Sequence, residues 1–402
     1  MELKKYKLGE ILDVTRGASL SGEFYATEGK YIRLTCGNFD YQNNCFKENK
    51  SKDNLYYIGD FKPEFLMEEG DIITPLTEQA IGLLGSTAII PESGKYIQSQ
   101  DVAKIICKEK LLYKDFAFYL ISSTLVKQQL SAAAQQTKIR HTSPDKIRDC
   151  TVWIPELTAQ KRIGKLLRSL DRKIELNRAI NQNLEAMVKQ LYDYWFVQFD
   201  FPNEEGKPYK SSGGEMVWNE KLKRFIPKGW ESTTLGNECQ MYQPKTLGLS
   251  ELDESAKYKV YGANGVIGKY HTYNHENSEI AMACRGNSCG TVNRTAPFSW
   301  ITGNAMVIKM IDDLIHNEYI KQALQYANID GAISGSGQPQ LTRENLNSIK
   351  LCKPTRELII CFSEQVSNII KMYLQNESNI EGLTRQRDEL LPLLVNGQIT
   401  IE

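Results

Sequence analysis

Few side-chain combinations in this sequence could do chemistry, and none completes a catalytic arrangement. The segment GANGVIGK at 262–269 resembles a phosphate-binding loop, but its glycines are spaced one residue too far apart and Tyr270 replaces the Ser or Thr. Pro144-Asp145-Lys146 is a poor nuclease match, no Ser-His-Asp or Cys-His arrangement stands out, and without any Pro-Pro pair the amino-methyltransferase signature is absent. We therefore expect no catalytic residue.

Metal chemistry is not expected either. The nine cysteines are scattered without a CxxC pair, and Cys284 and Cys289, the closest two, have no second pair or well-placed His beside them. His271 and His275 are four residues apart, but YHTYNHEN is typical of a strand and turn, not of a helix face. We predict no metal and no cofactor. Scattered thiols, with no membrane-length apolar run and no signal peptide, indicate a cytoplasmic protein.

One stretch, residues 158–196, dominates the predicted elements. It contains an unbroken heptad seam, apolar except for two Asn in its middle: Ile163, Leu167, Leu170, Ile174, Asn177, Asn181, Leu184, Val188, Leu191 and Trp195. Such a seam predicts one long helix paired with another. At about 1.5 Å per residue this helix would be roughly 58 Å long, which suits a spacer or scaffold.

The partner helix is predicted in the same chain, because the pattern returns 199 residues later. The second seam comprises Phe362, Val366, Ile369, Tyr373, Asn376, Ile380, Leu383, Arg387, Leu390 and Leu394. Leu8-Gly9 also recurs as Leu235-Gly236, so the chain is interpreted as a tandem duplication of a mixed domain followed by a long helix. An antiparallel pairing of 158–196 with 356–394 places Asn181 near Asn376 and Asn177 near Ile380, and we expect these amides to fix the register.

Charge supports the pairing of the two unlike helices. The chain has 49 basic and 49 acidic side chains, but residues 156–199 carry eight basic and five acidic residues whereas 355–402 carry four and seven. Excess charges of +3 and −3 favour this pair over two copies of either helix. The two mixed domains are each neutral, so charge alone does not indicate nucleic acid.

Several segments resemble the specificity subunits of type I restriction-modification systems. The central run LYDYWFVQFDFPNEEGKPYKSSGGEMVWNEKLKRFIPKGWESTTLG resembles that family's central region, and IPELTAQKRI resembles its entry to the first helix. RDELLPLLVNGQI resembles its C-terminal signature, and GSGQPQLTRENL the end of many target-recognition domains. The resemblance covers the whole chain in order.

The resemblance implies an α+β protein with two tandem α/β target-recognition domains, joined by two long antiparallel coiled-coil helices as a pseudo-twofold internal repeat. The expected bounds are 1–155 and 228–354 for the recognition domains, 156–199 and 355–402 for the helices, and 200–227 for a linker. It implies a chain without catalysis that binds double-stranded DNA, each domain reading half of a split site, beside two modification (methyltransferase) and two restriction (motor-nuclease) subunits. The helices would set the half-site spacing and dock the methyltransferase subunits.

Candidate DNA-contacting residues follow from the side chains that read base edges, namely Arg or Lys for guanine and Asn or Gln for adenine. Two aligned polar loops, 135–143 and 333–342, offer Gln136, Lys138, Arg140, His141, Ser336, Gln338 and Gln340. Strand ends and turns add Arg33, Asn38, Asn264, Arg285, Asn287 and Asn304. Each of these is equally consistent with an ordinary solvated loop residue.

Two other classes of function stay open at this point. A fused or stand-alone methyltransferase-specificity enzyme would need the catalytic motifs that the sequence lacks. A coiled-coil scaffold that does not bind DNA would leave two large non-helical domains unexplained.

Overall fold

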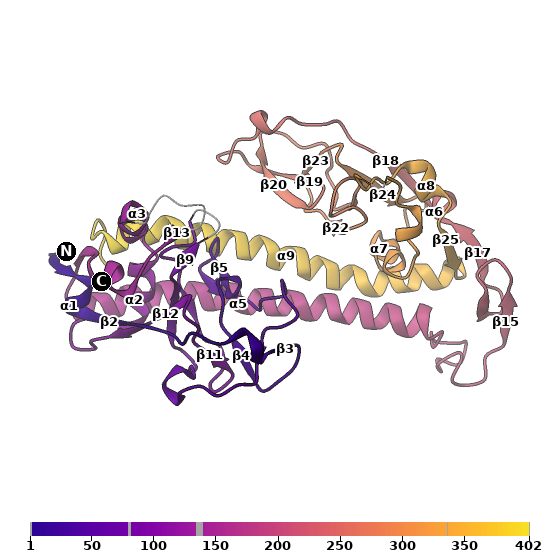
Figure 1. Cartoon of the computed structure of the whole chain (residues 1–402). Coiled ribbons are helices and arrows are strands. Elements are labelled where there is room, and N and C mark those ends of the chain that lie inside the picture. Colours follow the sequence, from indigo (N-terminus) through magenta and orange to yellow (C-terminus); the bar gives the residue numbers. More distant parts are fainter. Residues whose placement is uncertain (1, 79–81, 134–139, 336, 402) are drawn as a thin grey trace. The chain divides into compact units, whose positions relative to one another are not determined.

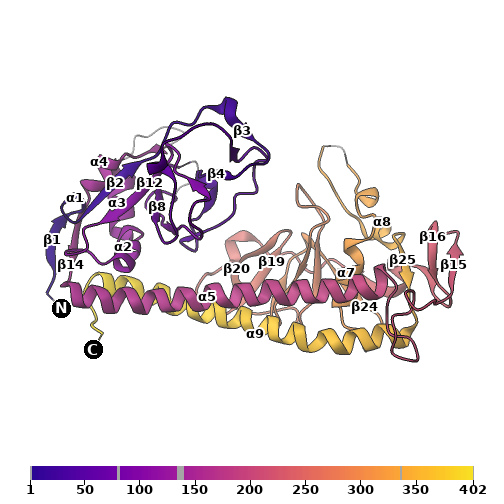
Figure 2. The same ribbon diagram turned by 90° about the horizontal axis from the view of Figure 1, so that it is seen from below.

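The computed structural model describes residues 2–78, 82–133, 140–335 and 337–401. The chain divides into two compact units, one formed by residues 1–176 and 379–402 and the other by residues 177–378. We call them unit 1 and unit 2. Each contains a sheet domain, residues 4–154 in unit 1 and 231–353 in unit 2, together with part of each of the two long helices (Figures 1 and 2).

Sheet domain 1 is built on an antiparallel four-stranded sheet whose strands lie in the order β10 (Ala88–Ile89), β8 (Ile72–Pro75), β12 (Val102–Cys107) and β2 (Leu12–Arg16). A second sheet has the order β11 (Tyr96–Ile97), β4 (Tyr31–Arg33), β7 (Tyr56–Tyr57) and β3 (Tyr25–Ala26). Separate two-stranded sheets complete the domain: β1 (Lys4–Lys7) with β14 (Thr151–Ile154), β5 (Phe39–Asp40) with β6 (Cys45–Phe46), and β9 (Thr77–Glu78) with β13 (Arg140–His141). Its helices are α1 (Leu8–Ile11), α2 (Lys114–Ile121), α3 (Thr124–Ala133) and α4 (Pro144–Arg148), with short turns at Gly22–Phe24, Cys36–Asn38 and Pro63–Phe65.

Sheet domain 2 repeats this plan. Its antiparallel sheet has the order β18 (Cys239–Tyr242), β24 (Ala305–Met310), β21 (Ile280–Ala283) and β22 (Val292–Arg294). A smaller sheet has the order β20 (Gly265–Tyr270), β19 (Tyr258–Gly262) and β23 (Trp300–Ile301), and β17 (Glu231–Thr234) pairs with β25 (Lys350–Lys353). Its helices are α6 (Leu235–Glu238), α7 (Glu318–Gln325) and α8 (Arg343–Asn347), with short turns at Leu249–Glu251 and Asp330–Ala332. A hairpin of β15 (Met216–Asn219) and β16 (Arg224–Pro227) precedes this domain.

The duplication predicted from the sequence is confirmed by matching hydrogen bonds in the two units. The amide of Leu8 donates to the carbonyl of Cys150 at 2.9 Å, and the amide of Leu235 donates to the carbonyl of Ile349 at 2.8 Å. The helices before β14 and β25 also begin alike, because a Ser143 or Thr342 hydroxyl accepts from the third helical amide in each. A hydroxyl at this position satisfies an amide that the helix itself cannot.

The two long helices are α5 (Leu157–Tyr192) and α9 (Arg356–Val395), of 36 and 40 residues. A π-helical turn at Asp193–Val197 follows α5. Within each unit the helices lie side by side (Figure 1). In unit 2 their contacts run from Asn181–Glu377 to Tyr192–Phe362, so residue numbers rise along α5 as they fall along α9. The predicted antiparallel pairing is therefore confirmed.

Several seam positions contribute to the hydrophobic cores at which helices and sheets meet. In unit 1, Ile163 and Leu167 share a core with Leu394 and with the buried face of α2. In unit 2, α7 shares a core with the seam residues Val188, Trp195, Phe362 and Val366. Each sheet domain therefore packs on its own part of the helix pair. Among the described residues, no helix has both the length and the apolar composition that crossing a membrane requires.

Candidate nucleic-acid interface

Two segments of sheet domain 2 that are distant in sequence form one surface, which we call the turn cluster: residues 284–291 between β21 and β22, and residues 334–335 and 337–341 before α8. The amide of Leu341 donates to the carbonyl of Cys284 at 2.9 Å, and the amide of Gly286 donates to the carbonyl of Pro339 at 3.0 Å. The second segment is also closed on itself, because Ser334 and Gln340 exchange two backbone hydrogen bonds of 2.9 and 2.8 Å. The backbone of the cluster is thus held from both sides.

Glycine is required in the turn cluster at Gly335. This residue has φ +90°, and a Cβ placed on it would lie 2.5 Å from the carbonyl oxygen of Gln338. Other residues rarely adopt this conformation, and the space beside it is already filled. Gly335 therefore suits a tight turn of the backbone, and the amide side chains of Gln338 and Gln340 that follow it are exposed.

The turn cluster brings together four of the predicted DNA-contacting residues. The side chains of Arg285, Asn287, Gln338 and Gln340 are all exposed. Asn304 is also exposed, and its carbonyl accepts from the amide of Cys284, which places it beside the cluster. Within the described part of the chain no carboxylate forms an ion pair with Arg285, so its guanidinium is available to a phosphate or a guanine edge.

Two other predicted residues of unit 2 lie outside this group. Asn264 is exposed on a different turn, between β19 and β20. Ser336 lies outside the described residues.

The end of the aligned loop in sheet domain 1 is attached in a similar way, since the amide of Thr142 donates to the carbonyl of Leu76 just after β8. Arg140 pairs with Glu78 at 2.9 Å and donates to the carbonyl of Ser131 at 2.7 Å. The Glu78 side chain is only 2 % exposed, so this ion pair is largely buried and fixes Arg140 against β9. His141 is exposed next to it. Gln136 and Lys138 lie outside the described residues.

Arg33 and Asn38 are buried and have partners within sheet domain 1. The Arg33 guanidinium lies 3.8 Å from the centre of the Tyr25 ring and donates to the carbonyl of Asn54 at 3.3 Å. The Asn38 side chain accepts from the amide of Thr35 at 2.9 Å and donates to the carbonyl of Lys47. These side chains therefore bind the domain's own loops and rings, and they are not exposed for contact with DNA.

A buried ionic network fixes sheet domain 2 on its helix segments. Arg294 on β22 donates to Glu318 on α7 at 2.6 and 3.0 Å, and the two side chains are 4 % and 0 % exposed. The same guanidinium lies 3.5 Å from Glu185 on α5 and 4.5 Å from the ring centre of Tyr373 on α9. Lys321 bridges Glu185 and Glu318 at 3.3 and 3.7 Å. Buried charges need such complete pairing.

In unit 1 a different buried network attaches sheet domain 1 to its helix segments. Arg387 on α9 pairs with Asp171 on α5 at 2.9 Å, and both side chains are about nine-tenths buried. From the sheet domain, the Tyr119 hydroxyl donates to Asp171 and the carbonyl of Asn43 accepts from Arg387. Burial and the nearby Asp171 carboxylate raise the pKa of Tyr119, so the phenol stays protonated as the donor. Sequence reasoning missed both networks, and its one signal was the charged Arg387 at an apolar seam position.

Of the amides predicted to fix the helix register, Asn181 contacts the other long helix in unit 2. Asn181 is 4 % exposed, and its side chain donates to Glu377 at 2.7 Å and to the carbonyl of Tyr373 at 3.3 Å. Glu377 directly follows Asn376 in the sequence, so the partner of Asn181 is one residue away from the predicted partner Asn376. Asn177 and Asn376 are both half-buried. That these amides determine the register stays a prediction.

The side chains considered for metal chemistry have other surroundings. Burial raises the pKa of Cys284 to about 11 and also raises that of Cys289, so both thiols are neutral at pH 7. His271 lies 3.3 Å from Asp253, whereas His275 stacks on Tyr242. No group of three or more metal-ligating side chains occurs among the described residues.

Comparison with known proteins accounts for this architecture. Residues 1–186 and 227–373 each match the sequence model of the type I restriction modification DNA specificity domain. The chain belongs to this family. The two matches fall one on each sheet domain, together with part of the adjoining long helix.

Curated relatives of this family match most of the chain. The chain is 22 % identical to the type I restriction enzyme MjaIX specificity subunit of Methanocaldococcus jannaschii, over 76 % of this chain and 73 % of that protein. It is 23 % identical to the HindI specificity subunit of Haemophilus influenzae, over 76 % and 81 %. Among solved structures, the type I restriction-modification S subunit of M. genitalium has a TM-score of 0.62 at 18 % identity, over 98 % of this chain and 96 % of that one. This structural likeness supports the fold.

Proposed function

We propose that this chain is the DNA-recognition subunit of a type I restriction-modification complex, and that each sheet domain reads one half of a split DNA site. The observation that carries the proposal is the double match to a DNA specificity domain, one on each sheet domain. The two sheet domains share a frame but differ in their loops, so the two half-sites should differ in sequence.

In this proposal the chain binds and positions, and the chemistry belongs to other subunits. The relatives are named specificity subunits of restriction enzymes, which supports a recognition role without catalysis. The proposed partners are double-stranded DNA, two modification subunits and two restriction subunits. The two long helices would set the number of unread base pairs between the half-sites and dock the modification subunits.

The turn cluster is the proposed reader in sheet domain 2. Arg285 can pair with a guanine edge or a phosphate, and Gln338 and Gln340 suit adenine edges. The cluster's internal hydrogen bonds hold these side chains on a fixed backbone, which base reading requires. In sheet domain 1 the corresponding loop ends at Arg140 and His141, and His141 is the exposed member of that pair.

Methylation mapping tests the proposal directly. Genomic DNA from cells that carry the complete system should be methylated at one split site, and removal of this chain should abolish that methylation. Changing Gln338 or Gln340 to Ala should relax reading of one half-site by about 1–3 kcal/mol of discrimination and leave the other unchanged. Gln325→Ala, an exposed amide on α7, is the matched control and should change neither half. Simultaneous loss of both half-sites, or of neither, would reject the turn cluster as the reader.

A further inference from the structure

A pocket of about 300 Å³ opens in unit 2 between the β15–β16 hairpin, β25 and the ends of α5 and α7. Its inner wall is aromatic, formed by Tyr192, Phe196 and Trp230, which are each at most 6 % exposed. Tyr326 stacks on Tyr192 with ring centres 5.9 Å apart and planes inclined by 11°. Unlike its neighbours, Tyr326 is 47 % exposed, so the pocket presents one ring edge to solvent.

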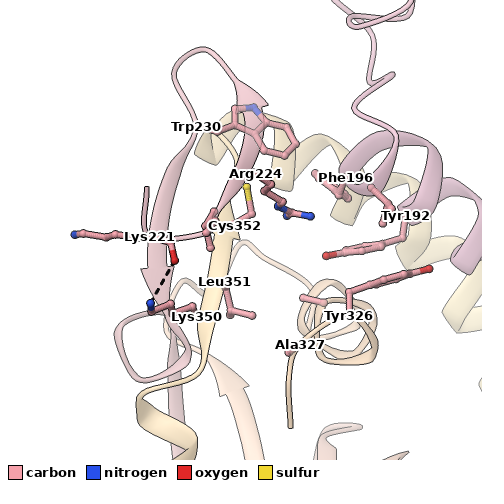
Figure 3. A pocket seen from close by; sticks show the side chains of 13 residues that line it. Tyr192, Phe196, Lys221, Arg224, Trp230, Tyr326, Ala327, Lys350, Leu351 and Cys352 are labelled. Atoms are coloured by element: carbon pink, nitrogen blue, oxygen red, sulfur yellow. Dashed lines mark hydrogen bonds between the residues drawn. The ribbon is translucent and has the colours of Figure 1, made fainter. Parts of the chain in front are cut away.

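Three cationic side chains complete the lining: Lys221, Arg224 and Lys350, all exposed. Figure 3 shows the Arg224 guanidinium directed toward the paired tyrosine rings, whereas the Lys221 side chain extends outward from the rim. The Lys350 ammonium lies at the rim, where it donates to the carbonyl of Lys221 at 3.3 Å. The positive charge therefore begins inside the pocket and continues onto the surface beside it.

Among the described residues, these three cations lack the acidic partners that neighbouring cations have. On the same hairpin Lys223 pairs with Glu220 at 3.0 Å and Lys228 pairs with Glu215 at 2.8 Å, and on β25 Lys353 pairs with Glu238 at 2.9 Å. In the described part of the chain, no carboxylate forms an ion pair with any of the three that line the pocket, and none lines it. Asp193, which accepts from the hydroxyl of the pocket residue Tyr326, is itself held at 2.6 Å by Lys189.

We propose that this pocket is the docking site for an acidic segment of a partner protein, one that inserts an apolar or aromatic side chain against Tyr192 and Tyr326 while its carboxylates meet Arg224, Lys350 and Lys221. Charge complementarity selects an acidic ligand. Because Lys221 points away from the cavity, a small molecule inside the pocket would leave that cation unused, whereas a chain crossing the rim reaches all three. The inference rests on the proposed function, which supplies the partner: the modification subunit of the same complex.

The test combines a charge-changing variant with a matched control. The variant carries Lys221→Glu, Arg224→Gln and Lys350→Glu, and the control carries Lys223→Glu and Lys228→Glu on the same hairpin outside the pocket. Affinity of the full chain for its modification subunit is measured by sedimentation at low and high salt, after thermal unfolding has shown that both variants fold. The pocket variant should bind at least about tenfold more weakly, with a smaller salt dependence, and the control should stay within about twofold of the unchanged chain.

Chemical cross-linking identifies the segment. A zero-length carbodiimide joins a lysine amine to a carboxylate that it touches, so mass spectrometry of the complex should find Lys221 or Lys350 joined to an Asp or Glu of the modification subunit. Equal loss in the pocket variant and the control, or no loss in either, would overturn the proposal. So would binding of adenosine monophosphate that depends on Arg224 while assembly does not, since that would assign the pocket to a small anion.

The outcome also separates this inference from the proposed function. If the complex assembles and reads a split DNA site but the pocket variant assembles normally, only the docking site is wrong. If the unchanged chain neither associates with the modification subunit nor directs methylation to a split site, the proposed function itself is wrong.

Discussion

Replacing Arg294 with Met should destabilise unit 2 strongly and leave unit 1 unaffected. The guanidinium makes two hydrogen bonds to Glu318, whose side chain is fully buried. Removing one partner of a buried ion pair costs about 3–5 kcal/mol, because the other charge stays buried without compensation. Lys321 at 3.7 Å and the amide of Gln322 at 2.7 Å still face Glu318, so we expect the lower end, about 3 kcal/mol.

Native-state hydrogen exchange followed by mass spectrometry suits this prediction, because it reports each unit of a two-unit chain separately. Amides of β22 and α7 should exchange through an opening that needs about 3 kcal/mol less free energy, while amides of α2 in unit 1 keep their protection. Arg356→Met is the control, since its ion pair with Asp312 lies at the surface and should contribute less than about 1 kcal/mol.

A second substitution tests the reason behind the number. If the cost comes from the stranded carboxylate of Glu318, adding Glu318→Gln to Arg294→Met should recover about 1–2 kcal/mol, because a neutral amide is cheaper to bury than an unpaired charge. A single variant within about 1 kcal/mol of the unchanged chain would refute the reasoning. A double variant that is less stable than the single one would show instead that packing around Arg294, and not charge, dominates.

Three further perturbations give distinct expected results. Arg387→Met should cost unit 1 about 3 kcal/mol by stranding Asp171, with faster hydrogen exchange in α2 and none of the change in α7. Asn181→Leu should leave the stability within about 1 kcal/mol, because the amide donates to Glu377 and to the carbonyl of Tyr373 but its own buried oxygen finds no partner among the described residues. A loss above about 2 kcal/mol would show that this amide is a net stabiliser. Gly335→Ala should weaken methylation at one half-site without lowering the Tm, since it strains only an exposed loop, and unchanged methylation would show that the loop's shape does not matter for reading.

The long-range plan of the fold was predictable from the sequence because it rests on repeated apolar patterns. A heptad seam specifies a helix and its buried face regardless of the details of its neighbours. The structure accordingly places Ile163, Leu167 and Val188 in the cores, as expected. Leu8 and Leu235, which the sequence repeat aligns, also make equivalent backbone hydrogen bonds in the two units.

The candidate site was only partly predictable, because exposure depends on contacts between distant segments. Arg33 has the composition of a base-reading residue, yet the Tyr25 ring and the carbonyl of Asn54 enclose it. Conversely, Arg285 and Gln340 are 55 positions apart and form a β-bridge that no local pattern indicates. The order of strands within each sheet was not predictable for the same reason.

The two buried networks show how a duplicated frame carries two different attachments. In unit 1 the ion pair, Asp171 with Arg387, lies between the two long helices, and the sheet domain adds neutral groups: the Tyr119 hydroxyl and a backbone carbonyl. In unit 2 the arrangement is reversed, since the closest ion pair, Arg294 with Glu318, lies within the sheet domain, and the helices add a carboxylate and an aromatic ring.

This reversal bears on why each sheet domain packs on its own helix segments and not on those of the other unit. If either domain were transplanted onto the other helix segments, each ion pair would survive, but the groups that cross between domain and helices would lose their partners. A buried polar group without its partner costs about 1–3 kcal/mol. The apolar seams of the two units follow the same repeat and therefore discriminate little between the two sets of helix segments. The polar groups that cross between domain and helices supply the preference for the native set.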